Sequence, residues 1–431
     1  MMTTSLQSIA TKAKRVKKHR FQNLCGLLTE EFLIDTYKYL NKNSATGLDK
    51  ISVREYGRNL KGNVKELVKR LTGKRYRAPM IKRVLIPKAN GKTRPLGLPV
   101  TEDKLLQLAV KRILSPIFEI DFLDCSYGYR PGLGGRDAVK AITRELNFGR
   151  YTYVVEADIK GFFDNIDHEW LIRMLKLRID DRVIIRLVEK WLRAGVLDVD
   201  GSVSYPTSGT PQGGIISPLL ANIYLHYALD LWFENVVKKH CKGEAYICRY
   251  ADDFVCAFRF SRDAERFYSA LEKRLDKFSL NLAEEKTRII KFNRHKKKGG
   301  KKFCFLGFEF FWDIDRSGKD CLKRRTDPKK QINSLKNFKV WCRESRNFRL
   351  RKLFNLLNSK LRGYYNYYGL IGNYDSMSKF FYNAIRILYK WLNRRSQRRS
   401  FNWSQFADVL EYYKIERPRI TEQRFEHGLF V

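Results

Sequence analysis

Several stretches of the chain show the pattern of hydrophobic and polar residues that is typical of β-strands. Segments 151–159 (YTYVVEADI) and 245–258 (AYICRYADDFVCAF) are rich in β-branched and aromatic residues, and two adjacent aspartates interrupt the second. Segment 81–100 reads as two short strands around an Asn-Gly turn signal, and segment 301–312 as another strand pair. The pattern therefore predicts β-hairpins at 81–100, 245–258 and 301–312.

Helical periodicity covers other parts of the chain. Thr29 is expected to cap a helix over 29–40, and Ser217 to cap a proline-initiated helix over 217–239. After the lysine- and arginine-rich segment 291–302, the chain reads almost wholly helical. The first helix there is expected to begin at Asp327-Pro328, with an apolar side formed by Ile332, Leu335, Phe338 and Cys342. Similar stripes farther along predict a small helical bundle.

The strong positive charge of the chain suggests the kind of partner. Its 431 residues carry 85 lysines and arginines against 46 aspartates and glutamates, a formal net charge of +39. A hydrophobic fraction of 44% is ample for a folded core, so disorder is not expected. A charge this large favours a polyanionic partner, and nucleic acid ranks before an anionic membrane surface.

A membrane span and a cysteine-based metal site are both disfavoured. Polar residues, among them Asp230, interrupt the most apolar stretch, 215–233, and no run of about 18 apolar residues exists. The eight cysteines form no C-x-x-C pair, and the spacing is poor for zinc at His240, Cys241, Cys248 and Cys256. We expect reduced thiols, an intracellular protein and no membrane partner.

Three aspartates are the candidate reactive groups. Asp158 lies near the end of an apolar strand, and Asp252 and Asp253 lie in the 245–258 hairpin. Each alone reads as a strand-end or turn aspartate with a capping role. Together, carboxylates at neighbouring strand ends can hold two divalent ions, and such ions activate a 3′-hydroxyl and stabilise a leaving pyrophosphate.

The motifs around these aspartates resemble those of a known family. RYADDFV resembles the Y-x-D-D box of reverse transcriptases, VVEADIKGFFDNIDH their first aspartate motif, and SGTPQGGIISPLLANIYL the motif that cradles the templating base and incoming nucleotide. LNLAEEKTRII and FCFLGFEF resemble the two motifs that follow. Four further stretches resemble motifs of group II intron reverse transcriptases, also called maturases. The fingers motifs are matched by IPKANGKTRPLGLP and FLDCSYGYRPGLGGRDAV, and the thumb motifs by LRGYYNYYG and WLNRRSQRRSFNWSQF.

The resemblance implies an α+β fold of the right-hand polymerase type. Fingers would occupy 30–150, a palm with an antiparallel or mixed sheet carrying the aspartate hairpin 151–312, and a helical thumb, or maturase domain, 313–415. A basic segment, 1–29, would precede them, and a short tail, 416–431, would follow. Because this tail holds one histidine and no cysteine, the HNH endonuclease of many family members is not expected.

The resemblance also assigns the reaction centre. Asp158 and Asp252 would be the principal metal ligands with Asp253 beside them, holding two Mg²⁺ ions for which Mn²⁺ can substitute. Lys286 would protonate the leaving pyrophosphate, and the alternative is a surface lysine. The residues expected to contact the incoming nucleotide are Lys88, Arg94, Ile159, Phe163, Gln212 and Gly213.

Three of these nucleotide contacts have a specific expected task. Lys88 and Arg94 are expected to bind the triphosphate. The ammonium of Lys88 is a compact point charge, and the planar guanidinium of Arg94 can donate two parallel hydrogen bonds to phosphate. Phe163 would stand against the sugar and exclude a 2′-hydroxyl, which favours DNA synthesis over RNA synthesis. Its neighbour Phe162 is expected in the core, because neighbours on a strand face opposite ways.

Nucleic-acid binding is expected mainly along the thumb. No acid occurs between Ser376 and Ala407, so one face there is expected to meet phosphate. The expected phosphate contacts are Arg362, Arg394, Arg395, Arg398 and Arg399. The tyrosines of 362–369 either stack on bases or pack the thumb helices, and packing is favoured for most of them.

Two functions follow from the resemblance. The first is copying an RNA template into DNA from a DNA primer and dNTPs. The second is binding group II intron RNA to assist splicing and mobility. The alternatives are a free-standing relative recruited for repair or defence, and a protein that is chiefly an RNA-binding splicing cofactor. The expected location is the bacterial cytoplasm, with nucleoid association during action on DNA.

Overall fold

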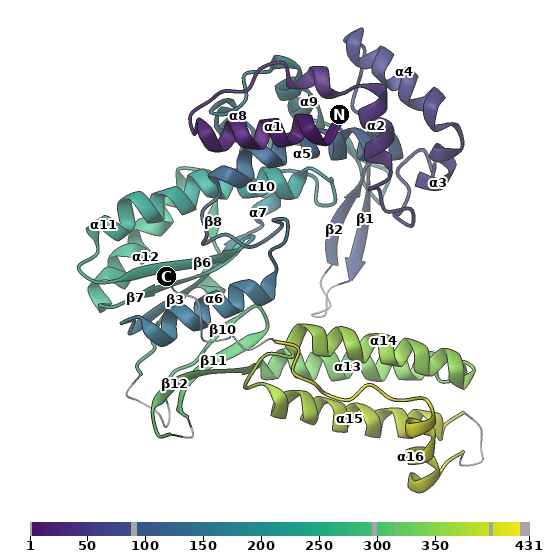
Figure 1. Ribbon diagram of the computed structural model, residues 1–431, viewed down its shortest axis with the longest axis vertical. Helices are drawn as coiled ribbons and strands as arrows, with labels where there is room; N and C mark the ends of the chain where they lie inside the picture. The colour runs from purple at the N-terminus through teal and green to yellow at the C-terminus, as the bar shows by residue number, and fades with distance from the viewer. Residues whose placement is uncertain (1, 88–92, 295–299, 316, 396–399, 423–431) are drawn as a thin grey trace. The chain divides into compact units, whose positions relative to one another are not determined.

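The computed structural model describes residues 2–87, 93–294, 300–315, 317–395 and 400–422. Lys88, Arg398, Arg399 and the turn of the 81–100 hairpin lie outside these residues. The fold is α+β, as predicted, and its contacts form two compact units (Figure 1). The first unit comprises Met1–Ala138 and Tyr153–Ile289, and the second comprises Val139–Thr152 and Ile290–Val431.

Helices make up most of the first unit. They are α1 (Met2–Arg15), α2 (Glu30–Tyr37), α3 (Val53–Tyr56), α4 (Leu60–Thr72), α5 (Thr101–Asp121), α7 (Phe162–Asn165), α8 (His168–Lys176), α9 (Arg182–Leu192), α10 (Ser217–Leu225), α11 (Lys238–His240) and α12 (Ser261–Asp276). The helix α6 (Gly135–Phe148) runs past the boundary at Ala138. Two π-helical turns, His226–Asp230 and Phe233–Val237, continue α10 toward α11.

Helix starts follow the predicted capping chemistry at one site and depart from it at another. Thr29 caps α2 as predicted, because its side chain accepts a hydrogen bond from Phe32 N at 3.2 Å. The prediction that Ser217 is a cap is wrong. Ser217 is the first residue of α10, and its hydroxyl donates to the carbonyl of Pro211 at 2.9 Å instead.

Two sheets organise the first unit. The first has the order β2-β1-β4-β5 and is built from β1 (Ile81–Pro87), β2 (Thr93–Leu98), β4 (Val196–Leu197) and β5 (Val203–Ser204). The second has the order β6-β7-β3-β8 and is built from β3 (Tyr153–Lys160), β6 (Ala245–Tyr250), β7 (Asp253–Phe258) and β8 (Asn281–Leu282); β9 (Arg288–Lys291) also pairs with β3. The hairpins predicted at 81–100 and 245–258 are therefore confirmed as antiparallel strand pairs.

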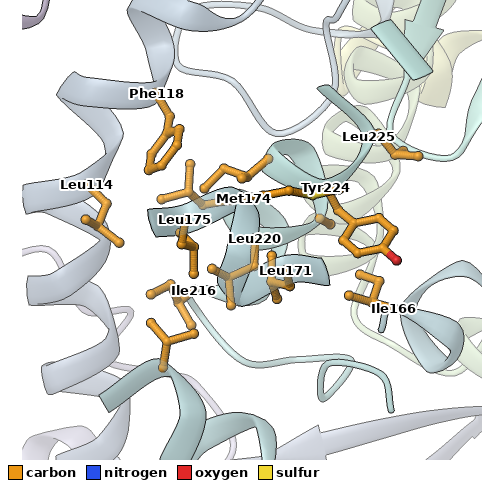
Figure 2. Close-up of a cluster of buried hydrophobic side chains, with 14 of the residues drawn as sticks. Leu114, Phe118, Ile166, Leu171, Met174, Leu175, Ile216, Leu220, Tyr224 and Leu225 are labelled. Carbon is orange, nitrogen blue, oxygen red and sulfur yellow. The ribbon is translucent and has the colours of Figure 1, made fainter. Parts of the chain in front are cut away.

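The hydrophobic core of the first unit lies where α5, α8 and α10 meet (Figure 2). Leu114 and Phe118 of α5 contribute to it, and so do Leu175 of α8 and Leu220 of α10, all essentially inaccessible to solvent. Each such side chain contributes about 1.5–3 kcal/mol when it is fully buried. Residues of β3 and β7 belong to the same buried cluster, so the helices and the second sheet share one core.

The second unit combines a small sheet with a helical bundle. Its elements are β10 (Phe303–Phe305), β11 (Phe308–Ile314), β12 (Asp320–Thr326), α13 (Pro328–Ser345), α14 (Leu350–Tyr368), α15 (Tyr374–Leu392) and α16 (Trp403–Tyr412). The hairpin predicted at 301–312 and the helical bundle are both confirmed. The prediction of almost wholly helical structure after 302 missed β12. Its inward positions include Arg324 and Thr326, and these polar residues hide the strand pattern.

One predicted apolar position of the bundle is wrong. Phe338 and Cys342 are buried in α13, but Ile332 is 53% exposed. The inward side of the helix instead continues through Leu335 to Gln331, whose side-chain amide donates to Ser376 O at 2.8 Å. Ile332 is one residue from that line, which turns it about 100° away from the bundle. None of the helices in the described ranges has the length and apolarity to cross a bilayer.

Candidate active site

Strand pairing brings the predicted aspartates together. In the antiparallel pair of β3 and β7, Asp158 lies opposite Asp253. Side chains on directly opposite residues have Cβ atoms about 4.5–5.5 Å apart. Asp252 lies in the turn between β6 and β7, next to Ala251, whose φ of 57° is in the left-handed region. The site is therefore built at the end of a buried strand pair and a strained turn.

Burial and repulsion between carboxylates raise the pKa of two of these residues, Asp252 and Asp253. Burial raises the pKa of Asp253 to about 7, and the charges of Asp158 and Asp252 act in the same direction. The pKa of Asp252 is also raised, chiefly by burial and further by the charge of Asp158. Nearby positive charge favours the ionised forms, and Arg94 and Lys286 supply it at Asp252.

Lys286 is a direct partner of the site. It lies in a short 3₁₀ turn, Glu284–Lys286, and its Nζ forms an ion pair with Asp158 Oδ2. This hydrogen bond raises the pKa of Lys286. The lysine that the sequence placed in the reaction centre therefore does lie beside the first aspartate.

The acids suit a divalent cation by their chemistry. Crowded carboxylates disfavour one another's ionisation, and a hard cation with oxygen ligands removes that cost. As they stand, no three His, Cys, Asp or Glu side chains in the described part of the chain enclose a metal position. The ammonium of Lys286 supplies the positive charge at Asp158 instead.

A second group of predicted residues lies where β2 meets the 208–214 segment. Arg94 Nε donates to Gln212 Oε1 at 2.9 Å, and Gly97 N donates to the carbonyl of Gln212 at 2.5 Å. Gly213 has a φ of 115°, and a Cβ there would lie 2.4 Å from the carbonyl oxygen of Gly97. Glycine is therefore required at position 213 because the chain packs closely against β2. The sequence interpretation gave a different reason, the close approach of a nucleotide to the backbone.

A pocket of about 320 Å³ opens beside this group. Its lining includes Arg83 and Gly97 of the β1–β2 hairpin, Asp164, Thr210 and Gln212. Thr210 is 3% exposed, and its hydroxyl oxygen has no hydrogen-bond partner among the described residues. Because that oxygen is itself buried, the missing hydrogen bond is a local cost rather than a contact offered to a ligand.

The structure places the two adjacent phenylalanines differently from the sequence interpretation. β3 ends at Lys160, and Gly161, with a φ of 57°, turns the chain into the helix α7. Phe162 and Phe163 both lie on that helix and are 2% and 6% exposed, so the strand argument for Phe162 is wrong although its burial is confirmed. The ring of Phe163 meets Tyr129 edge-on, with centroids 6.3 Å apart.

Ile159 also lies apart from any solvent-facing surface. Its side chain is 2% exposed and belongs to the core of the first unit, while its backbone pairs with Leu282 of β8. Any contact between this residue and a nucleotide therefore requires its backbone.

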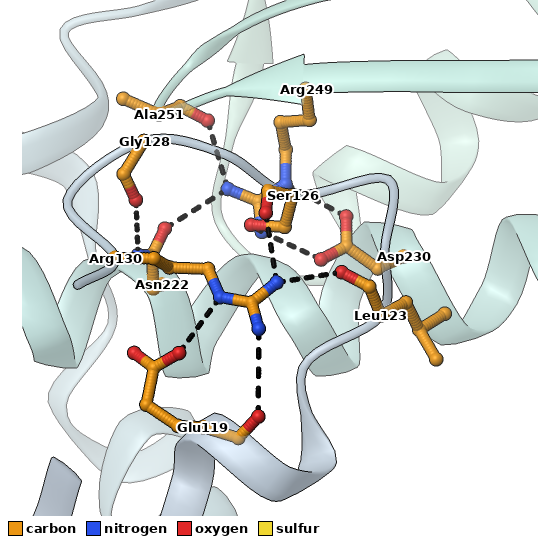
Figure 3. A network of polar contacts seen from close by, with 9 residues as sticks. All are labelled: Glu119, Leu123, Ser126, Gly128, Arg130, Asn222, Asp230, Arg249 and Ala251. Atoms are coloured by element: carbon orange, nitrogen blue, oxygen red, sulfur yellow. Dashed lines mark hydrogen bonds and ion pairs between the residues drawn. The ribbon is translucent and has the colours of Figure 1, made fainter. Parts of the chain in front are cut away.

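The sequence interpretation missed a buried ionic group behind the aspartate turn. Arg249, one residue before Tyr250, is fully buried and pairs with the fully buried Asp230 (Figure 3). A signal for both residues existed. Arg249 stands in an apolar strand and Asp230 in the most apolar stretch of the chain, and buried charges require partners.

The predicted phosphate-binding residues of the second unit have mixed surroundings. Arg362 is 53% exposed and pairs with Glu416, with Nη2 2.8 Å from Oε1. Arg394 is exposed, whereas Arg395 is half-buried and donates to the carbonyl of Phe348 at 2.8 Å. The tyrosines mostly pack, as predicted: Tyr365 is fully buried, and Tyr364 stacks on Phe380 with centroids 3.8 Å apart.

One face of α15 in the second unit is basic. Lys379, Arg386 and Lys390 are all exposed, and their spacing of seven and four residues places them along one side of the helix. The residues Phe380, Ala384 and Leu388 are buried in the bundle. This exposed stripe, together with Arg394, lies in the acid-free segment.

Comparisons with known proteins show which sequences this chain resembles. Residues 86–310 match the family described as reverse transcriptase (RNA-dependent DNA polymerase). The chain is 33% identical over 404 residues to the group II intron-encoded protein LtrA of Lactococcus lactis subsp. cremoris, an alignment that covers 74% of this chain and 65% of that protein. It is 31% identical over 356 residues to protein YkfC of Escherichia coli, covering 74% of this chain and 91% of YkfC.

A shorter match extends the comparison to an intron protein of yeast. The chain is 38% identical over 173 residues to the putative COX1/OXI3 intron 1 protein of Saccharomyces cerevisiae, covering 40% of this chain and 20% of that protein. This chain therefore spans just under two thirds of the Lactococcus protein and a smaller part of the yeast protein.

Proposed function

Because this chain belongs to the reverse transcriptase family and is homologous to proteins encoded by group II introns, we propose that it is an RNA-directed DNA polymerase that also binds intron RNA. The observation that carries the polymerase proposal is the pairing of Asp158 with Asp253 beside the turn of Asp252. A general structural role would not require three carboxylates to share one partly buried place.

The carboxylates are the ligand set of the proposed reaction. Asp158, Asp252 and Asp253 would hold two Mg²⁺ ions, with Mn²⁺ as a substitute. When bound, such ions activate the primer 3′-hydroxyl and stabilise the leaving pyrophosphate. Asp158 would contribute its carboxylate to this set, and the ammonium of Lys286, which pairs with Asp158 in the structure, would be the proton donor to the leaving pyrophosphate.

The Arg94–Gln212 group would orient the incoming dNTP. Arg94 is exposed on β2 and offers further guanidinium donors to a triphosphate beyond its bond to Gln212. Lys88 belongs to the same proposed contact by sequence. Phe163 would face the sugar from α7, supported against Tyr129, and leave no room for a 2′-hydroxyl.

The template strand is the proposed occupant of the pocket beside Gln212. Gly209, Thr210 and Gln212 of its lining belong to the segment that resembles the template-cradling motif, and Arg83 also lines it. In the right-hand description, the first unit would hold the fingers and most of the palm. The helices of the second unit would form the thumb.

Intron RNA is the proposed partner of the second unit. The basic stripe of Lys379, Arg386 and Lys390 favours phosphate, and no acid lies between Ser376 and Ala407 to weaken it. The Lactococcus relative is named as a group II intron-encoded protein, and this similarity supports intron RNA as a partner of this chain. A free-standing polymerase without an intron is the alternative.

Extension of a DNA primer on an RNA template tests the proposal. The purified protein should add dNTPs when Mg²⁺ is present and stop when EDTA removes it, with activity returning on Mg²⁺ addition. A heteropolymeric template distinguishes copying from untemplated addition, because the product sequence must complement the RNA. The proposal fails if purified, folded protein adds no complementary nucleotides with either Mg²⁺ or Mn²⁺.

A further inference from the structure

The buried arginine behind the aspartate turn is bonded to its full capacity. Arg249 Nε donates to Asp230 Oδ1 at 2.7 Å, and Nη2 donates to Asp230 Oδ2 at 2.6 Å and to Ser126 Oγ at 2.7 Å. Nη1 donates to Asn222 Oδ1 and to the carbonyl of Ala251, both at 3.1 Å. All five donors of a guanidinium are thus used (Figure 3).

The bond to Ala251 acts on the turn that presents the aspartates. Ala251 has a φ of 57°, a conformation that residues with a Cβ rarely adopt without support. Its carbonyl is held by Arg249, two residues earlier, and the next two residues are Asp252 and Asp253. A change in this turn would therefore move the carboxylates themselves.

The same hydrogen-bond network holds a second loop, residues 126–130, in close contact with the aspartate turn. Asn222 Nδ2 donates to the carbonyl of Gly128 at 2.6 Å, and a Cβ on Gly128 would lie 2.4 Å from Ala251 N. Arg130 holds the loop from its other side, because its Nη1 donates to the carbonyl of Ser126 at 2.9 Å while Nε pairs with Glu119 (Figure 3). The loop 126–130 and the aspartate turn are therefore fixed as one piece.

We propose that Arg249 is a positioning residue for nucleotidyl transfer: with its charge balanced by Asp230, it holds the Ala251 carbonyl and so fixes the turn that presents Asp252 and Asp253. The inference rests on the proposed polymerase function. Stability alone does not account for this group, since well-packed apolar residues commonly replace a buried ion pair without loss. Positioning does, because a misplacement of about 1 Å in a reaction centre can slow the reaction about 100-fold.

A paired substitution separates positioning from folding. Arg249→Met with Asp230→Leu removes both charges together, so neither is left buried and unpaired. Arg249→Lys is the milder variant. It keeps the positive charge, but an ammonium has three donors and cannot satisfy all the acceptors that now bond the guanidinium. The matched control is Arg178→Met with Asp121→Leu, which removes another buried ion pair of the first unit, one with no bond to the aspartate turn.

Each protein is tested for folding by thermal unfolding and for single-nucleotide addition on an RNA-templated primer. We expect the Arg249 double variant to lower the maximal rate about 100-fold while the apparent dNTP affinity changes less than about threefold. Arg249→Lys should lower the rate less, and the Arg178 control should keep the parent rate. A folded Arg249 double variant or Arg249→Lys protein at the parent rate overturns the proposal, as does an equal loss in the control.

Two readouts do not require polymerase activity. Hydrogen–deuterium exchange of peptides covering 245–258 should be faster in both Arg249 variants and unchanged in the control. Mn²⁺ binding, followed by electron paramagnetic resonance, should weaken in the same two variants. If the parent adds no nucleotides, the polymerase proposal fails, and exchange and Mn²⁺ binding judge the positioning role alone. If the double variant does not fold, Arg249→Lys decides, and unchanged exchange and Mn²⁺ binding in it reject the role.

Discussion

The two units of this molecule treat charge in opposite ways. In the first, a chain with a net charge of +39 gathers three acids at one strand end and fixes them by register and buried hydrogen bonds. In the second, the basic stripe on α15 lies exposed on a helix, with no acid between Ser376 and Ala407. Fixed, partly buried charge suits chemistry, and exposed like charge suits binding to a polyanion.

This difference predicts two kinds of sensitivity. Small changes to the acids of the first unit should abolish a reaction, because metal ligation and alignment depend on every oxygen. Loss of one cation from the second unit should weaken binding by a small step, because phosphate neutralisation is spread over many contacts.

The largest effect is expected at Asp158. Asp158→Asn keeps the shape of the side chain but removes the charge of one proposed metal ligand, and RNA-templated primer extension should fall by on the order of 10³-fold or more. Single-turnover addition of one dNTP measures this. Asp276→Asn, which removes the same charge from the exposed end of α12, should keep the parent rate. Equal rates for Asp158→Asn and parent would remove Asp158 from the reaction centre.

The next effect is expected at Lys286. Lys286→Gln removes the proposed proton donor, and general acid catalysis typically contributes about 10²–10⁴-fold. We therefore expect a maximal rate about 100-fold lower, with little change in apparent dNTP affinity. Lys277→Gln, another exposed lysine of the first unit, is the control. If Lys286 only balances the charge of Asp158, its loss should leave the rate at saturating Mg²⁺ unchanged.

A smaller and more selective effect is expected at Phe163. Phe163→Ala should raise ribonucleotide incorporation relative to deoxyribonucleotide by about tenfold, since steric exclusion of one hydroxyl is lost. Phe162→Ala is a matched control, because both rings are buried on α7 and removal of either costs about 3–5 kcal/mol of stability. Competition between labelled CTP and dCTP measures the ratio. An equal change in both variants would assign the selectivity to loosened packing.

The smallest effect is expected in the acid-free segment. Replacing Arg394, Arg398 and Arg399 with Gln removes three positive charges and leaves the bond from Arg395 to Phe348 in place. If each contacts phosphate, the slope of log affinity against log salt should become shallower by about 2, at about 0.7 for each contact. Titrations of labelled RNA at several salt concentrations measure the slope. An unchanged slope would show that these arginines face solvent in the complex.

Arg395→Gln sharpens the same comparison. Its guanidinium donates to the carbonyl of Phe348, so the substitution should lower the stability of the second unit by about 1–3 kcal/mol and leave the salt slope of RNA binding unchanged. Chemical unfolding followed alongside RNA titration separates the two outcomes. A full step in slope with unchanged stability would reassign Arg395 to phosphate binding.

The sequence predicted which residues meet at the site better than it predicted the contacts that hold them there. The aspartates, Lys286 and the hairpins follow from local pattern and motif resemblance, and the structure brings Asp158, Asp253 and Lys286 together. The pairing of Arg249 with Asp230, nineteen residues apart, depends on tertiary packing that no local pattern contains. The need for glycine at position 213 is equally non-local, because a Cβ there would meet the carbonyl oxygen of Gly97 on β2.

Errors at the level of elements have physical causes of the same kind. β12 was missed because its inward positions hold Arg324, which pairs with Glu422 near the end of the described chain. Phe162 and Phe163 were placed on a strand because nothing local showed that Gly161 would take a left-handed conformation. The fold class was predictable since the hairpins and helices depend on periodicity, whereas these features depend on partners distant in sequence.

We propose that the acids of the first unit perform the reaction while the cations of the second bind RNA. The most direct test is Asp252→Ala, with primer extension and the salt dependence of RNA binding measured on the same preparation. We predict that extension is abolished while RNA affinity and its salt slope remain those of the parent, because only the reaction centre is lost. Extension at the parent rate, or loss of RNA binding in step with extension by folded protein, would contradict the claim.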